Sequence, residues 1–334
     1  MALAGFELVQ DFGDAAAEAR TCRMDCALFD FSFLECARLE GTHARSVIET
    51  FTRRSMIALS ERQIVYALRT GPDDELVADW TVWRTGPNSF EVMSGRREDV
   101  VDLLGCDGPG VNVADLTAHK ATFAVQGPRT LEALRKLGDV SRLESLRYFT
   151  FDRFSLAGIA CTIGRLGYTG EAGVEIIVER GQAPDLWKAL ASQIRPAGFV
   201  AADILRIEAG FVLFTNEFCI PVLPREAGLE KFCAANRVLK PELSLVAFRA
   251  ETGRLSWPWR PPRDLQRPAE PATIAVTSAC NSVMAGGILG LGYVLAGTAR
   301  ETAIQDSMGT FRNIQLVPKP FYDTAKLRPR APWR

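Results

Sequence analysis

The stretch between residues 253 and 271 constrains the fold most, because it holds five prolines. Proline fixes φ and has no backbone N–H, so it interrupts helices and central strands. We therefore expect a proline-rich loop over residues 253–271 that contains neither a long helix nor a central strand. This loop separates two kinds of sequence pattern along the chain.

Strand-like and helical runs alternate before the loop, whereas β-rich runs dominate after it. One helix is predicted over residues 42–54, with Thr42 as its N-cap. Short strands are predicted near the C-terminus, at residues 273–278, 288–295, 301–305 and 311–317. These strands fit a small β-barrel or sandwich. We predict an α+β fold, with two α+β subdomains in residues 1–235 and a C-terminal β-barrel domain in residues 236–334.

The charge and hydropathy of the chain exclude two classes of partner. The formal net charge of −1 lacks the basic surplus of a nucleic-acid-binding protein, and the one basic run, residues 326–334, is interpreted as a solvated tail. No segment reaches the roughly 18 apolar residues that a membrane-spanning helix needs. We expect neither a nucleic-acid nor a membrane partner.

The cysteine and histidine content limits which disulfides and metal sites the chain can form. Eight cysteines with irregular spacing predict no disulfide framework and no zinc site, and two histidines leave little material for a histidine-based metal site. We therefore expect no metal. Without a recognisable secretory signal, buried free thiols indicate a reducing cytoplasm.

Two acids stand inside apolar strand-like runs. Asp79 lies in the run Leu76–Trp83, close in sequence to Tyr66, and its pKa would be raised if the carboxylate were buried. It is therefore a functional residue or part of an exposed face. Glu175 lies in the run Val174–Val178, and it either faces solvent by period-two alternation or binds a ligand.

A third candidate lies in a predicted helix over residues 203–211. Asp203 and Arg206 are one helical turn apart there. The ordinary interpretation of this spacing is a helix ion pair, and the alternative is a role in a binding site.

Five motifs in the same order, over about residues 27–229, resemble the folate-binding T-protein family. They are Leu28–Ser32, Val125–Pro128, Gly167–Glu171, Leu205–Gly210 and Arg225–Leu229. Members of this family include the glycine-cleavage aminomethyltransferase, demethylases and the folate domain of sarcosine dehydrogenases. The resemblance implies three domains in a cloverleaf ring with tetrahydrofolate in a central cavity. It also implies transfer of a methyl or aminomethyl group from a small N-, O- or S-methyl donor.

The resemblance assigns a role to individual residues. Asp79 matches the catalytic acid near N5 and N10 of the pterin, and Glu175 matches the acid that binds the pterin ring. Tyr66 is expected to form an aromatic wall for the p-aminobenzoate group. Arg206 and Tyr168 match further cofactor-binding positions.

The chain departs from the family pattern at two places near these residues. Ala78 stands where the family has the first acid of an acidic pair, and the asparagine-rich folate loop becomes Met93–Arg96 without asparagine. These changes favour a donor other than the aminomethyl-lipoyl group of the glycine-cleavage enzyme. Two alternatives remain open, namely a non-catalytic folate-binding protein and an accessory subunit of a flavin dehydrogenase with a flavoprotein partner.

Overall fold

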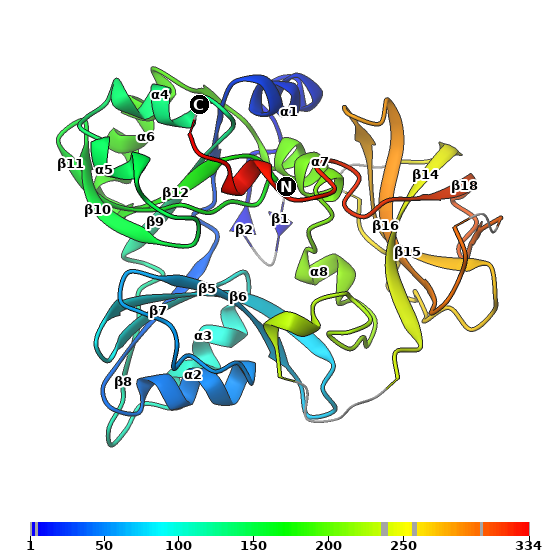
Figure 1. Cartoon of the computed structure of the whole chain (residues 1–334), viewed down its shortest axis with the longest axis horizontal. Coiled ribbons are helices and arrows are strands. Elements are labelled where there is room, and N and C mark those ends of the chain that lie inside the picture. Colours follow the sequence, from blue (N-terminus) through cyan, green and yellow to red (C-terminus); the bar gives the residue numbers. More distant parts are fainter. Residues whose placement is uncertain (1, 4–5, 235–239, 256–258, 301–302, 334) are drawn as a thin grey trace.

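The computed structural model describes residues 2–3, 6–234, 240–255, 259–300 and 303–333. Three larger sheets surround a centre that contains helix α7 (Phe199–Glu208) (Figure 1). The two-residue strands β1 (Ala2–Leu3) and β2 (Phe6–Glu7) form a small additional antiparallel pair. The predicted α+β fold is confirmed. The predicted boundary between residues 235 and 236 lies outside the described residues.

The first sheet is antiparallel, with the strand order β5-β6-β7-β4-β8. Its strands are β4 (Glu35–Glu40), β5 (Ile64–Thr70), β6 (Leu76–Gly86), β7 (Ser89–Ser94) and β8 (Asn112–Asp115). Helices α2 (Ala44–Thr52) and α3 (Arg97–Leu104) pack on one face, over a core that includes Trp80 and Val82. Because side chains alternate along a strand, Asp79 and Thr81 of β6 face away from this core.

Helix α2 corresponds to the predicted helix, but its N-cap was predicted wrongly. The N-cap is His43 rather than Thr42, and no side chain caps the helix. The chain enters the helix through backbone hydrogen bonds, from His43 N to Gly110 O and from Ala44 N to Gly41 O. These bonds begin the helix one residue later than the capping pattern suggested.

The second sheet has the order β10-β11-β12-β9-β3-β13, and only the β3–β13 pair is parallel. Its strands are β3 (Ala27–Asp30), β9 (Lys120–Gln126), β10 (Phe151–Leu156), β11 (Ile159–Gly164), β12 (Gly173–Glu179) and β13 (Arg195–Pro196). The helical segments around it are α4 (Thr130–Arg135), α5 (Ser141–Glu144), η1 (Arg180–Gln182) and α6 (Ala183–Ala191). Val174 and Ile176 of β12 pack into a core with residues of α4 and α6, on one face of the sheet. Glu175 and Ile177 therefore face the other way, where Ile177 packs with Trp83 of the first sheet.

The third sheet nearly closes into a barrel, which confirms the predicted C-terminal β-barrel. Its order is β17-β15-β16-β14-β18, and a bridge between Ile304 and Ile314 brings the two edges together. The strands are β14 (Leu243–Gly253), β15 (Thr273–Ser282), β16 (Gly287–Leu295), β17 (Gln305–Asp306) and β18 (Phe311–Val317). Gly253, at the start of the predicted loop, is the last residue of β14, and the other described residues of the proline-rich loop hold no helix or strand. Residues 256–258 of that loop and residues 301–302 of a predicted strand lie outside the described residues.

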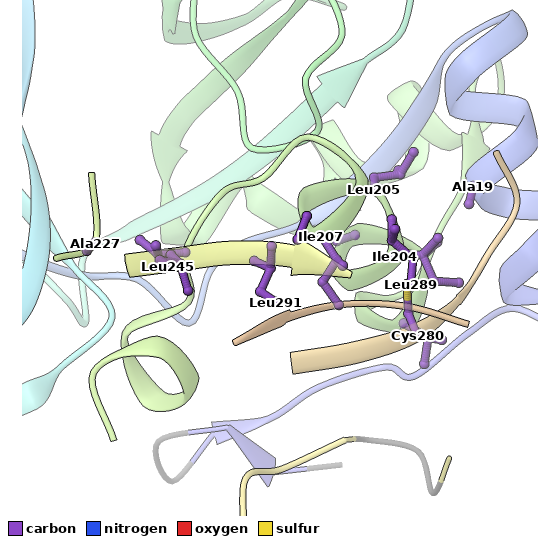
Figure 2. Packing of buried hydrophobic residues seen from close by; sticks show 14 of the residues in the cluster. Ala19, Ile204, Leu205, Ile207, Ala227, Leu245, Cys280, Leu289 and Leu291 are labelled. Carbon is purple, nitrogen blue, oxygen red and sulfur yellow. The ribbon is translucent and has the colours of Figure 1, made fainter. Parts of the chain in front are cut away.

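Helix α7 joins the barrel to the other two sheets. All ten of its residues are buried, which is typical of a helix enclosed on every side. Ile204 and Ile207 pack against barrel residues that include Leu289 and Leu291, and Ala19 of α1 (Ala15–Met24) belongs to the same cluster (Figure 2). The short segments α8 (Phe214–Glu217) and η2 (Glu230–Phe232) follow α7 in the chain.

Residues 318–333, here named the C-terminal strap, return from the barrel to the second sheet (Figure 1). Their backbone and side chains are bound along the way, since Tyr322 N donates to Glu208 O at 2.8 Å and Trp333 Nε1 donates to Leu143 O at 3.0 Å. Arg328, in η3 (Arg328–Arg330), forms an ion pair of 2.9 Å with Glu171. The interpretation of this basic run, residues 326–334, as a solvated tail is therefore wrong, because Arg328 and Trp333 of the run bind other parts of the protein.

Candidate functional site

Tyr66 and Asp79 meet on neighbouring strands of the first sheet. In the β5–β6 register, Leu68 lies opposite Asp79 and Tyr66 lies opposite Thr81. Tyr66 and Asp79 are therefore diagonal neighbours on the face that points away from the core of this sheet. The Tyr66 hydroxyl donates a hydrogen bond of 3.1 Å to Asp79 Oδ2. The pairing predicted from sequence thus corresponds to a direct contact.

The environment of Asp79 changes its acidity. Burial raises the pKa of Asp79 to about 6, although the hydrogen bond from Tyr66 and a backbone N–H favour the charged form. Burial and the nearby Asp79 charge together raise the pKa of Tyr66 well above its usual range, so the phenol stays protonated and remains a donor. The pair offers a carboxylate that is mostly ionised at neutral pH, with a pKa only about one unit below neutral pH.

Tyr168 belongs to the same region. Burial raises the pKa of Tyr168 well above its usual range, and the Asp79 charge contributes to this shift. The Tyr168 hydroxyl donates to Val212 O at 2.6 Å, and the ring stacks on Phe211 with centroids 6.1 Å apart. The ring is therefore held in place by the segment that follows α7.

Glu175 is a buried carboxylate whose oxygens have no hydrogen-bond or ion-pair partner within the described residues. Its exposed fraction is 7%, and burial raises its pKa to about 7. The sequence left open whether this residue faces solvent or binds a ligand, and the alternation of β12 turns it inward, onto the same face as Ile177. A buried acid without a donor is costly, and a ligand with two N–H groups would satisfy it.

Arg206 is completely buried and binds protein groups. Its guanidinium donates to Asp203 at 2.7 Å, to Glu217 at 2.8 Å and to Ser278 at 2.7 Å, and also to Phe211 O at 3.1 Å. The helix ion pair expected from the sequence is therefore present within a larger network. Contact between Arg206 and a cofactor stays a prediction. Arg206 thereby holds the Phe211 carbonyl in place. The carbonyl of the next residue, Val212, accepts the hydrogen bond from Tyr168.

The altered loop at residues 93–96 is packed against other elements. Ser94 is buried and its hydroxyl donates to Asp99, while a Cβ on Gly95 would collide with the Phe214 ring of α8. A glycine therefore lets α8 approach this loop closely.

Some residues around the candidate site carried no signal in the sequence. The ring of Phe232 in η2 meets Tyr66 edge-on, with centroids 4.9 Å apart, and Arg54 Nη1 donates to Tyr66 O at 2.6 Å. These contacts join segments that are distant in sequence, and spacing could not indicate them. In the described part of the chain, no group of three or more potential metal ligands occurs. No described helix combines the length and apolar character that a membrane crossing requires.

Comparison with known proteins agrees with this geometry. The family model described as the GCVT N-terminal domain matches residues 1–237. The aminomethyltransferase of Moorella thermoacetica is 28% identical, over 96% of this chain and 93% of its own. An aminomethyltransferase from a Thermoanaerobacter species is 30% identical, over 69% of this chain and 65% of its own. The crystal structure of the glycine cleavage system aminomethyltransferase T from Bartonella henselae superposes with a TM-score of 0.79 at 21% identity, and the match covers 97% of this chain and 94% of that one.

The three surrounding sheets and this structural match define an α+β protein with the T-protein fold. The chain belongs to the GCVT N-terminal domain family, that is, to the glycine-cleavage T-protein family of enzymes. The family and the enzyme class predicted from the motifs are confirmed.

Proposed function

We propose that this enzyme transfers a methyl or aminomethyl carbon from a small N-, O- or S-methyl donor to tetrahydrofolate. The observation that carries the proposal is the combination of the Tyr66–Asp79 pair with the unpartnered carboxylate of Glu175. The names of the curated relatives support the aminomethyltransferase class. The donor is proposed to differ from an aminomethyl-lipoyl group, since Ala78 replaces one family acid.

The residues present fit a reduced pterin. Glu175 offers two acceptor oxygens without a protein donor, which suits the exocyclic amine and adjacent ring N–H of a pterin. Tyr66 and Tyr168 provide aromatic surface for the flat parts of the cofactor. Tetrahydrofolate, when bound, would supply the nitrogen atoms that accept the one-carbon unit. A central cavity for it remains part of this proposal.

The chemical role of Asp79 follows from its ionisation. As an anion in a buried setting, it stabilises positive charge that develops on a nearby nitrogen and can take up a proton there. Tyr66 keeps the carboxylate oriented through its hydrogen bond. In the described region Asp79 has no cationic partner, so its charge is free to act on the substrate.

Substitution of Asp79 by Asn tests the assignment. We expect Asp79→Asn to lower kcat at least about 100-fold, in the usual range for loss of a general acid–base or charge-stabilising group. Tetrahydrofolate affinity, measured by calorimetric titration, should stay within about threefold, because the amide keeps the shape. Asp73→Asn, at an exposed turn, is the matched control. Turnover that survives Asp79→Asn contradicts the role.

The donor can be identified with a screen of N-, O- and S-methyl compounds for methylation of tetrahydrofolate. Folate binding without turnover on any donor favours the non-catalytic alternative. Co-purification with a larger flavoprotein, from which a one-carbon unit is received, favours the accessory-subunit alternative. All eight cysteines are free thiols, which supports a reducing cytoplasm as the place of action.

A further inference from the structure

The loop that joins β11 to β12, residues 165–172, carries Tyr168 and is named here the Tyr168 loop. It has a buried charge near each end, since Arg165 has an exposed fraction of 5% and Glu171 one of 2%. A buried charge is costly unless protein groups bind it. The position of the loop therefore depends on the groups that bind these two residues.

The C-terminal strap binds the first end of the Tyr168 loop. Arg165 Nη2 donates to Ala331 O, and the Arg165 guanidinium carbon lies 4.6 Å from the centre of the Trp333 ring. Trp333 is itself held by its hydrogen bond to Leu143 O. A further bond of 2.8 Å runs from Arg165 Nη1 to Leu146 O. The strap thus gives this buried cation one hydrogen-bond acceptor and one aromatic face.

The strap also binds the other end of the Tyr168 loop, through Arg328. Arg328 Nε donates to Glu171 Oε2 at 2.9 Å, and Arg23 Nη1 of α1 donates to Oε1 at 3.1 Å. The centre of the Tyr322 ring lies 3.9 Å from the guanidinium carbon of Arg23 and 5.2 Å from that of Arg328. Glu171 is therefore held jointly by α1 and by the strap.

The strap reaches the ring partner of Tyr168 as well. Lys326 Nζ lies 5.1 Å from the centre of the Phe211 ring, and this ring stacks on Tyr168. Beside it, a Cβ on Gly210 would lie only 3.1 Å from Pro320 Cα of the strap. The glycine thus lets the strap pack closely against the segment that follows α7.

These contacts converge on one short loop. Arg165 and Glu171 are six positions apart in the chain, and Tyr168 lies midway between them. Each end also keeps a bond that does not involve the strap, namely the one to Leu146 O and the one from Arg23. Loss of the strap contacts should therefore loosen the Tyr168 loop without unfolding the protein.

We propose that the C-terminal strap is a positioning element of the candidate site, in which Arg328 and Trp333 hold the two ends of the Tyr168 loop and thereby fix the Tyr168 ring. The inference rests on the proposed function, in which Tyr168 lies against the cofactor. The strap residues act through Tyr168 and need no contact with the ligand. A loop that is free at its ends loses conformational entropy when a ligand orders it, so the affinity for that ligand falls.

The experiment loosens one end of the loop at a time, with Arg328→Met and Trp333→Leu. Arg328→Lys keeps the positive charge and tests rescue, and Leu327→Ala, at a strap residue that is 64% exposed, is the matched control. Each change is made in the wild-type enzyme and in a Tyr168→Leu background. Tetrahydrofolate affinity is measured by calorimetric titration. Amide hydrogen exchange of residues 166–171 is measured on the ligand-free proteins.

We expect Arg328→Met and Trp333→Leu each to weaken tetrahydrofolate binding about three- to tenfold, the usual effect of losing one polar contact. Amide exchange in the Tyr168 loop should become faster, because its local opening costs less free energy. In the Tyr168→Leu background the same changes should alter affinity by less than about twofold, since coupled residues do not act additively. Arg328→Lys should recover at least about half of the lost affinity, and Leu327→Ala should match wild type.

Unchanged amide exchange in both loosened variants would overturn this proposal. It would also be overturned if the strap substitutions weakened binding as much in the Tyr168→Leu background as in wild type, because the strap would then act on the ligand directly or through overall stability. Failure of the wild-type enzyme to bind tetrahydrofolate would instead contradict the proposed function. The two failures are distinguishable, since amide exchange reports on the Tyr168 loop without any ligand.

Discussion

At the scale of single residues, Glu175 is a buried acid whose carboxylate has no hydrogen-bond or ion-pair partner in the described part of the chain. Its pKa of about 7 lies above the usual 4.5, so the folded protein binds a proton more tightly than the unfolded chain does. The stabilising effect of that proton is fully present below about pH 4.5 and is lost as the pH rises through 7. A shift of this size corresponds to about 3 kcal/mol at alkaline pH.

Glu175→Gln should therefore stabilise the ligand-free protein. We expect a higher melting temperature than wild type at pH 8 and a smaller difference at pH 5, measured by differential scanning calorimetry. Glu179→Gln, at the exposed end of the same strand, should show no such gain. A structural role for Glu175 predicts the opposite sign, namely a lower melting temperature at pH 8.

Tyr66 should set the acidic limit of activity. The Tyr66 hydroxyl favours the charged form of Asp79, so its removal in Tyr66→Phe should raise the pKa of that acid above about 6. If catalysis needs the ionised carboxylate, activity falls as the pH drops through this pKa. We expect the acidic limb of the kcat/KM profile to move up by about one to two pH units, the worth of one hydrogen bond to a charged group. An unmoved limb would show that Asp79 does not control the profile.

At the scale of elements, the buried network around Arg206 holds α7, α8 and the barrel together. Glu217 accepts bonds from Arg206, from Leu213 N at the start of α8 and from Thr277 of β15. Burial alone would lower the pKa of Arg206, but Asp203 and Glu217 raise it, so the guanidinium stays charged. This network also supports the segment that holds Tyr168.

Arg206→Met should leave two buried acids without their cation. We expect a loss of about 3–5 kcal/mol in the free energy of unfolding, measured by urea denaturation. Arg312→Met removes an exposed arginine of β18 and should change stability by less than about 0.5 kcal/mol. A similarly small effect of Arg206→Met would mean that the network contributes little to joining these elements.

The sequence predicted those elements whose patterns are local. The short strands near the C-terminus follow from β-rich runs, and the proline-rich loop interrupts regular structure because proline lacks a backbone donor. Helix α7 begins four residues before the predicted Asp203, because its first turn is buried as completely as the rest and shows no amphipathic boundary. The fixed position of the C-terminal strap depends on distant partners such as Leu143, which composition cannot indicate.

At the scale of the whole molecule, the motifs singled out the candidate site acids but could not show how they lie relative to one another. Tyr66 and Asp79 were expected together, and the strand register brings them into contact. The inward direction of Glu175 depends on tertiary packing, because one face of β12 packs on α4 and α6 and the other faces the first sheet. Phe232 of η2 and Tyr66 of β5 come from segments that meet only after the chain folds, so no spacing rule could find their contact.

The central claim is that a reduced pterin binds in the centre of the molecule through Glu175 and lies beside Asp79. Calorimetric titration with tetrahydrofolate at pH 7.5 tests it most directly, on wild type, Glu175→Gln, Asp79→Asn and the control Glu179→Gln. The account predicts one site per chain, affinity about tenfold or more weaker in Glu175→Gln alone, and near-wild-type affinity in the other two. Binding that ignores the Glu175 substitution, or no binding by the wild-type enzyme, would contradict it.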